Sequence, residues 1–312
     1  MSWQVFNIRD MTTLKSKLII ILGPTATGKS DLAVEIARKC NGEVISADSR
    51  QVYRGLNIGA GKITKREMRG IPHHLLDVAN PKQQFSVAQY QRLATRAISD
   101  IIKRDKTPIV CGGTGFYIQS IVENTVLPNV PPNPILRKEL SQKNVAELFT
   151  ILTTLDQERA QNIDAKNPVR LVRAIEIATA LGNIPQNTTT SQIYDILQIG
   201  LTLSPDTLRR KIFLRLKKRL KQGMIAEGKR LHADGISWKR MRELGLEYRA
   251  LADFLTNTIT QEQMEKNILL ESYQYAKRQT TWFKRDKRIE WFAPTQTKEI
   301  VDRVMKFLKT SK

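Results

Sequence analysis

One short loop between a predicted strand and a predicted helix constrains the fold of this chain more than any other feature. The loop reads Gly23-Pro24-Thr25-Ala26-Thr27-Gly28-Lys29-Ser30 and fits the phosphate-binding pattern G-x-x-x-x-G-K-[ST]. The apolar residues before it, 18–22, are typical of a buried strand, and apolar residues recur at helical spacing after it, over 31–37. Strand, loop and helix in this order predict a P-loop, of the kind normally associated with nucleotides, in an α/β protein.

The chemistry of this loop predicts a phosphate site. Gly23 and Gly28 allow the backbone to curl so that successive N–H groups point at an anion. The helix that begins near Lys29 adds the positive end of its dipole. The Lys29 ammonium can reach terminal phosphoryl oxygens, and the Ser30 hydroxyl can ligate Mg²⁺. The pattern does not identify which phosphate ester is bound.

The charge of the chain favours a polyanionic partner. The 312 residues, enough for one large domain or two moderate ones, carry a net charge of +21, with 51 Lys and Arg against 30 Asp and Glu. A small anion needs only a local positive pocket, whereas an excess along the whole chain suits a nucleic acid backbone. A generally basic, soluble surface is the alternative interpretation.

Cysteine usage and hydropathy indicate a reducing compartment and no membrane contact. Cys40 and Cys111 form no C-x-x-C or Cys/His cluster, which indicates neither a disulfide framework nor structural zinc. His73 and His74 lack a third ligand at metal spacing, so we expect a structural role. No apolar stretch approaches the roughly 18 residues of a membrane span, and residues 1–17 lack an apolar signal core. We therefore expect a cytoplasmic protein.

Two further strand ends are expected beside the phosphate loop. A predicted strand over 43–47 runs into Asp48, and another over 108–111 runs into Gly112-Gly113-Thr114. In doubly wound sheets ligands gather at the carboxyl ends of the strands. Asp48 could serve as a general base, as a Mg²⁺ partner through water, or as a helix N-cap. The glycines either allow close packing or bring bare backbone to a substrate, with the Thr114 hydroxyl as donor or acceptor.

The middle of the chain changes to a purely helical pattern. Four of the residues 127–134 are proline, which predicts a stiff extended connection. A helix capped by Asn167 and ended by Gly182 follows, then a polar loop over 183–191 and a strand over 196–203. We predict a P-loop NTPase-like core of 1–121 and 198–312, with a parallel sheet flanked by helices. Residues 122–197 are predicted to form an all-helical insertion domain.

Two basic stretches predict nucleic acid contacts in the last third. The helix expected over 208–221 carries eight Lys and Arg residues and no acid, with leucine and isoleucine every fourth residue on its buried side. At least one of its cations is expected to face phosphate. Residues 275–288 interleave aromatic side chains with Lys and Arg, which suits stacking on unpaired RNA bases. Core aromatics beneath a basic surface are the alternative.

Taken together, these motifs resemble the tRNA dimethylallyltransferases, which prenylate the adenosine just 3′ of the anticodon. The matching stretches run in family order over nearly the whole chain and are the phosphate loop, Asp48 to Tyr53, Pro72 to Asp77, Gly112 to Tyr117, Arg170 to Glu176 and Tyr275 to Arg285. Only the first of them is common outside the family. In one respect the chain departs from the pattern: many relatives have Gly-Tyr-Lys-Glu where it reads Gly245-Leu246-Glu247-Tyr248-Arg249.

The resemblance implies a reaction and a set of catalytic residues. The P-loop would hold the diphosphate of dimethylallyl diphosphate, with Lys29, Arg215 and a Mg²⁺ ion at Ser30 stabilising the leaving group. Asp48 would accept the proton of the adenine amine while Thr114 orients that nitrogen. The helical insertion would clamp the tRNA, and the enzyme would be a monomer.

The resemblance also implies which residues face the tRNA anticodon stem-loop. Locally, Arg170 and Arg173 suit surface salt bridges as well as phosphate contacts. The implied set is Asp48, Ser49, Arg50, Gln51, Thr114, Arg137, Arg170, Arg173, Arg242, Gly245, Lys277 and Arg278.

Three other functions share part of this pattern. A P-loop kinase of a small metabolite would use the same phosphate loop, yet would leave the charge of +21 and the basic aromatic stretch unexplained. An isopentenyltransferase of free adenine nucleotide would need neither the helical insertion nor tRNA. A non-enzymatic RNA-binding protein would have no use for Lys29 or Asp48. Neither predicted strand tail carries the hydrophobic run followed by Asp that nucleotide-hydrolysing proteins use.

Overall fold

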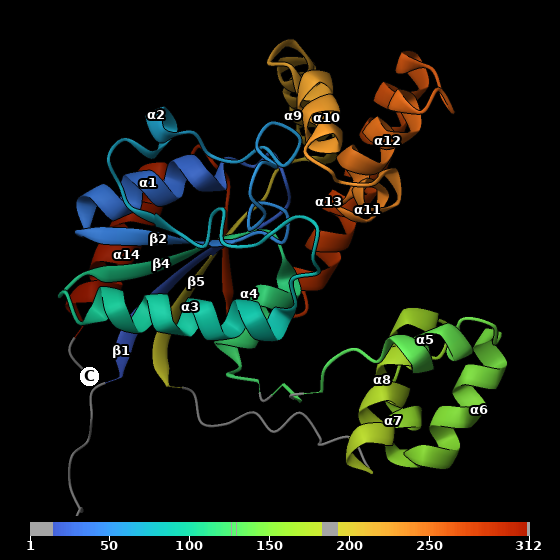
Figure 1. Ribbon diagram of the computed structural model, residues 1–312. Coiled ribbons are helices and arrows are strands. Elements are labelled where there is room, and N and C mark those ends of the chain that lie inside the picture. The colour runs from blue at the N-terminus through green and yellow to red at the C-terminus, as the bar shows by residue number, and fades with distance from the viewer. Residues whose placement is uncertain (1–14, 126, 129, 183–192, 311–312) are drawn as a thin grey trace, which may run out of the picture. The chain divides into compact units, whose positions relative to one another are not determined.

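The chain folds into two compact units, shown in a computed structural model (Figure 1). The structure describes residues 15–125, 127–128, 130–182 and 193–310. Unit 1 consists of Met1–Val122 and Gln192–Lys312, and unit 2 of Glu123–Ser191. The predicted polar loop over 183–191 lies outside the described residues.

Unit 1 is built on a six-stranded sheet in the order β3-β2-β4-β1-β5-β6, and every neighbouring pair is parallel. The strands are β1 (Ser16–Leu22), β2 (Gly42–Ala47), β3 (His73–His74), β4 (Thr107–Gly112), β5 (Tyr194–Leu201) and β6 (Ile289–Phe292). Gly112, the last residue of β4, is in register with Leu22 of β1 and with Ala47 of β2. These three central strands therefore end at one edge of the sheet. The predicted α/β fold with a parallel sheet is confirmed.

Helices cover both faces of this sheet because side chains alternate along each strand. Ile19 and Ile21 of β1 join one apolar cluster, whereas Leu18, Ile20 and Leu22 join the other. The first cluster is covered by α1 (Lys29–Lys39) and α14 (Thr297–Lys309), and the second by α3 (Val87–Ile102) and α4 (Gly115–Val122). Figure 1 shows α1 and α3 on opposite faces.

A further group of helices stands beyond the carboxyl edge of the sheet and carries much of the site. It consists of α9 (Pro205–Lys221), α10 (Met224–Ala233), α11 (Trp238–Glu243), α12 (Leu246–Leu255) and α13 (Gln261–Phe283). Their apolar sides, including the fully buried Tyr248 and Met241, continue the second cluster. The longest of them, α13, begins with a capping box in which Thr260 and Gln263 satisfy each other's backbone amides.

Unit 2 is a small helical unit with its own core. Its helices are α5 (Pro134–Leu140), α6 (Val145–Leu155), α7 (Gln157–Gln161) and α8 (Pro168–Leu181), and they enclose a separate apolar cluster that includes Leu152 and Leu171. The predicted cap of α8 is confirmed, since the Asn167 side chain accepts a hydrogen bond from the Arg170 N–H. Gly182, with a φ of 83°, ends the helix as predicted.

Two local features differ from the sequence analysis. Strand β5 begins at Tyr194, so the chain returns to the core sheet before residue 198. The glycine- and proline-containing stretch 58–77, whose composition favours irregular backbone, contains the short helix α2 (Lys65–Met68) and strand β3. Within β3, His74 Nε2 lies 2.7 Å from the buried Glu43 carboxylate, which gives this histidine the structural role that we expected. No helix in the described part of the chain is both long and apolar enough to cross a bilayer.

Candidate active site

A cavity of about 400 Å³ lies at the carboxyl edge of the sheet, within unit 1. Its floor consists of residues that follow β1, β2 and β4, including Lys29, Asp48 and Gly113. Its walls come from α9, α12 and α13, through Arg215, Glu247 and other side chains. The predicted convergence of three strand ends with the phosphate loop is therefore observed.

The phosphate loop adopts the curled backbone that its sequence predicts. Gly23 has a φ of 137° and a Cβ there would lie 2.5 Å from the Leu201 carbonyl oxygen, so only glycine fits this position. Gly28 and Ala26 also have left-handed φ values, of 92° and 62°. The Thr27 hydroxyl donates to the Pro24 carbonyl at 2.9 Å and fixes the turn.

Lys29 projects from the start of α1 into the cavity. Its ammonium donates to the Pro24 carbonyl at 2.6 Å. Burial, together with the charge of Arg215, lowers the pKa of Lys29 to about 8. Burial also raises the pKa of the adjacent Cys111 thiol to about 12, so this thiol is neutral and contributes no charge to the site.

Arg215 is the cation of α9 that meets the phosphate loop. Its guanidinium donates to the Thr25 hydroxyl at 3.1 Å and to the Gly61 carbonyl at 3.3 Å. Burial, and then the neighbouring Arg219, lower the pKa of Arg215 to about 10. Arg219 of the same helix is also turned inward, 9% exposed, and pairs with Glu247 at 3.0 Å. The buried side of α9 thus carries two arginines as well as the predicted apolar residues.

Asp48 caps a turn that follows β2. Its Oδ1 accepts hydrogen bonds from the backbone N–H groups of Arg50 at 2.8 Å and Gln51 at 3.3 Å. A capping role was one of the three that the sequence allows for Asp48, and here the carboxylate caps a turn and not a helix. Asp48 also lines the cavity. Thr114 is not itself in the cavity lining, but its hydroxyl accepts the Ser49 N–H at 3.0 Å and interacts with the hydroxyl of Tyr275, and both Ser49 and Tyr275 line the cavity.

Helix α13 contributes a site residue that sequence reasoning missed. Gln279, only 6% exposed, accepts the Thr25 N–H at 2.9 Å and donates to the Gly113 carbonyl at 2.8 Å. It therefore joins the phosphate loop to the turn after β4. The residue lies in the stretch 275–288, whose charges and aromatic rings predict RNA contacts, and an uncharged amide among them gives no signal of a partner in the phosphate loop.

The aromatic residues of α13 divide between two roles. Tyr275 lines the cavity, where burial and the charge of Asp48 raise the pKa of its hydroxyl to about 12. Phe283 is 3% exposed and Trp282 packs against the same core. The prediction of base stacking is wrong for Phe283, which is buried in the core, and it stays a prediction for the partly buried Trp282.

Of the predicted tRNA contacts in unit 1, five line the cavity besides Asp48. They are Ser49, Arg50, Gln51, Gly245 and Arg278. Gly245 has a φ of 133°, and a Cβ there would lie 2.8 Å from Arg50 Nε, so glycine leaves room for this arginine. Lys277 is exposed outside the cavity lining. Arg242 does not line the cavity either, and it donates a hydrogen bond to Asp253 at 2.6 Å.

The predicted tRNA contacts in unit 2 form ion pairs. Glu176, whose side chain is fully buried, accepts hydrogen bonds from Arg137 at 2.7 and 2.8 Å and from Arg173 at 3.2 Å. Arg170 lies 3.6 Å from Asp164. The salt bridges that the sequence allowed are thus present, and a role of these arginines in RNA binding stays a prediction.

The oxygen donors at the site fit a substrate-bound magnesium ion better than a protein-held metal. Among the described residues, no group of three or more His, Cys, Asp or Glu side chains could hold a metal. Ser30 is exposed on the cavity wall directly after Lys29. Mg²⁺ commonly binds one or two protein oxygens and completes its shell with water and substrate phosphates. Ser30 fits that arrangement.

These features define a P-loop enzyme of the α/β class, with a cationic phosphate cradle beside a carboxylate. Residues 51–286 match the sequence model of the family described as IPP transferase. The chain belongs to this family. The matched range begins at residue 51, so the phosphate loop and Asp48 lie just before it.

Relatives of known name are similar over most of the chain. A tRNA dimethylallyltransferase of Anoxybacillus flavithermus is 37% identical over 284 residues, which cover 89% of this chain and 91% of the relative. A tRNA dimethylallyltransferase 2 of Trichlorobacter lovleyi is 41% identical, with 87% and 88% covered. The crystal structure of a tRNA isopentenylpyrophosphate transferase from Bacillus halodurans superposes with a TM-score of 0.72 at 35% identity, with 95% of this chain and 97% of that chain covered.

Proposed function

We propose that this protein transfers a dimethylallyl group from dimethylallyl diphosphate to the N6 amine of the adenosine 3′ to the anticodon in tRNA. One observation carries the proposal: a single cavity connects the P-loop to Asp48, and Arg215 bonds directly to Thr25 of that loop. The names of the similar proteins support the same substrates. A cytoplasmic location and a monomeric state belong to the proposal as well.

In the proposed reaction the N6 nitrogen forms a bond to the first carbon of the dimethylallyl group while the bond from that carbon to the diphosphate oxygen breaks. The electron pair of the broken bond leaves with diphosphate. The positive charges of Lys29 and Arg215 stabilise the negative charge that develops on the diphosphate, so this stabilisation grows as the bond breaks. Ser30 would hold Mg²⁺, which supplies further neutralisation of the diphosphate when bound.

Asp48 is the proposed acceptor of the proton that the amine loses. The lone pair of an adenine amine is delocalised into the ring, so the nitrogen becomes a good nucleophile only as its proton departs. Oδ1 of Asp48 is occupied by two backbone N–H groups, which fixes the carboxylate while leaving Oδ2 for the substrate. Thr114 contacts the backbone of Ser49, directly after Asp48, and is proposed to orient the same nitrogen.

The tRNA must present the adenine outside its stack, because the carboxylate lies in the cavity and not on an open face. Unstacking costs a few kcal/mol, which contacts with the anticodon stem-loop must offset. The arginines at the cavity, Arg50 and Arg278, are the proposed phosphate contacts.

A transfer assay with labelled dimethylallyl diphosphate and Mg²⁺ tests this function. The acceptors are bulk tRNA, AMP or none, and we expect label in tRNA alone. Label in AMP would indicate a free-nucleotide acceptor. No transfer, together with ATP-dependent phosphorylation of a metabolite, would indicate a kinase.

The variant Asp48→Asn tests the role of Asp48 as the proton acceptor. Asp48→Asn keeps an oxygen that can cap the turn but removes the base, so we expect tRNA binding to persist while kcat falls roughly 100-fold or more. Asp302→Asn, an exposed carboxylate on α14, is the control with unchanged turnover. Near-normal turnover of Asp48→Asn would show that another group takes the proton.

A further inference from the structure

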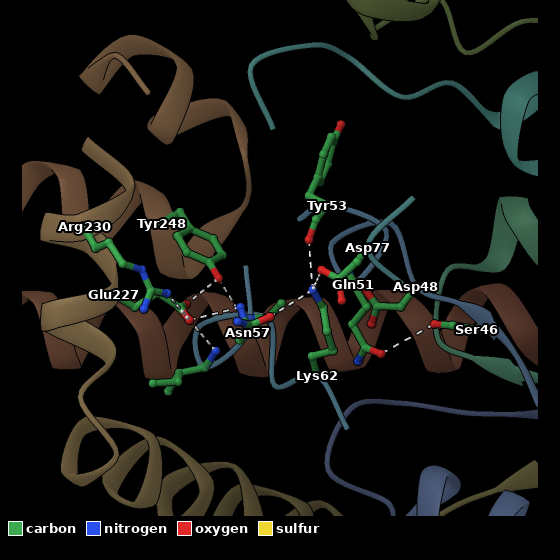
Figure 2. A network of polar contacts seen from close by, with 12 residues as sticks. Ser46, Asp48, Gln51, Tyr53, Asn57, Lys62, Asp77, Glu227, Arg230 and Tyr248 are labelled. Atoms are coloured by element: carbon green, nitrogen blue, oxygen red, sulfur yellow. Dashed lines mark hydrogen bonds and ion pairs between the residues drawn. The ribbon is translucent and has the colours of Figure 1, made fainter. Parts of the chain in front are cut away.

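A buried carboxylate on α10 holds a loop that lines the active site. Glu227 is 2% exposed, and its oxygens accept three consecutive backbone N–H groups, from Asn57 at 3.0 Å, Ile58 at 2.8 Å and Gly59 at 2.9 Å (Figure 2). Successive amides that converge in this way form an anion-binding concavity. Here the anion is a side chain about 170 residues away in sequence, so the loop is fixed by long-range structure and not by its own turn chemistry.

Tyr248 of α12 completes this anchor. Its hydroxyl donates to Glu227 at 2.8 Å and accepts the Ala60 N–H at 3.1 Å, so four successive amides are held (Figure 2). Burial and the adjacent carboxylate raise the pKa of Tyr248 well above its ordinary value, which keeps the hydroxyl a donor. The loop passes directly over the ring: a Cβ at Gly59 would lie 2.7 Å from Tyr248 Cζ.

The far side of the same loop contacts both inward arginines of α9. Gly59 offers its carbonyl to Arg219 at 3.1 Å, and Gly61 offers its carbonyl to Arg215 at 3.3 Å. A Cβ at Gly61 would clash with the guanidinium groups of both Arg219 and Arg215, so the loop and the two arginines are in close contact. Ala60 itself lines the cavity.

We propose that Glu227 and Tyr248 are positioning residues for Arg215, acting through the loop 57–61. Two guanidinium groups side by side repel each other, and the carbonyl groups of this loop offset that repulsion by accepting a hydrogen bond from each. The carbonyls can do so only where the loop is held. When the loop is released, Arg215 loses its hydrogen bond to the Gly61 carbonyl. Its guanidinium is then no longer held in the orientation that reaches the Thr25 hydroxyl.

A double-mutant cycle on diphosphate binding tests this inference. Tyr248→Phe removes the hydroxyl but keeps the ring, and we expect about tenfold weaker binding of inorganic diphosphate with Mg²⁺ by calorimetry. In an Arg215→Lys background the same change should alter binding by less than about twofold, because the positioned group is gone. A purely structural role would give equal factors in both backgrounds.

This inference rests on the proposed function, in which Arg215 binds the diphosphate, and the controls allow the two to fail separately. Tyr90→Phe removes a buried hydroxyl that has no hydrogen-bond partner among the described residues, and should leave diphosphate binding unchanged. Where Tyr248→Phe does not fold, by circular dichroism, Glu227→Gln takes its place in the cycle. Equal factors in both backgrounds, or unchanged binding in the native background, would overturn the inference. Absence of prenyl transfer by the native protein would overturn the proposed function and leave the binding cycle interpretable.

Discussion

At the scale of single residues, the protonation of Lys29 makes ligand binding depend on pH. Burial and Arg215 hold its pKa at about 8, so at pH 9 roughly nine tenths of the free protein carries a neutral amine. A bound diphosphate favours the ammonium form and raises this pKa. The free protein therefore takes up a proton when it binds diphosphate at pH 9, and its affinity falls as the pH rises above 8.

Calorimetry in buffers of different ionisation enthalpy measures this proton. We expect an uptake approaching one proton at pH 9 and much less at pH 7, where the free protein is already charged. Lys29→Met should abolish the uptake. An undiminished uptake in this variant would assign the proton to another group.

At the scale of elements, Glu176 ties α5 to α8 in unit 2 through Arg137 and Arg173. Burial raises the pKa of this carboxylate, but hydrogen bonds from Arg137, Asn133 and Arg173 outweigh burial and lower it overall. A carboxyl whose pKa is lower in the folded state contributes stability above its ordinary pKa, and loses that contribution as the pH falls through the lower, folded-state value.

Replacing this carboxylate should loosen unit 2 alone. Glu176→Gln removes the charge that the two guanidinium groups share. Because both guanidinium groups are about a third exposed and stay hydrated, we expect the cost of hydrogen bonds to a charged group, about 1.5–3 kcal/mol. Hydrogen exchange by mass spectrometry should show faster exchange in α8, by at least roughly tenfold at neutral pH. The variant should also lose less protection on acidification than the native protein. Glu147→Gln, an exposed capping residue that glutamine can replace, should leave α8 unchanged.

Elements that depend on local sequence could be predicted, and those that depend on distant partners could not. The cap at Asn167 and the strand end at Asp48 follow from short-range rules of helix capping and of parallel sheets. The anchoring of loop 57–61 by Glu227 and the bridge made by Gln279 arise between segments far apart in the chain. No pattern within either segment encodes such a partner. The inward position of Arg219 has the same origin, since its partner Glu247 lies on another helix.

At the scale of the whole molecule, the net charge of +21 predicts a steep dependence of tRNA affinity on salt. The logarithm of the association constant should fall linearly with the logarithm of salt concentration, because bound cations are released. Arg278→Ala removes a cation at the cavity and should reduce the slope by about one. Lys306→Ala, an exposed cation on α14, is the matched control with an unchanged slope. Equal slopes for all three proteins would place the RNA elsewhere.

Helix α13 carries two neighbouring residues that are proposed to contact different ligands. Arg278 faces the cavity where RNA is expected, while Gln279 bonds to the Thr25 amide in the diphosphate cradle. A rigid helix cannot shift for one ligand without changing the fit of the other. The tRNA dissociation constant should therefore change when diphosphate is present, by the same factor as the diphosphate constant changes with tRNA. In Gln279→Leu that factor should approach one, and a factor of one in the native protein would contradict the coupling. With this coupling, the enzyme would recognise its two proposed substrates as a matched pair and not as two independent ligands.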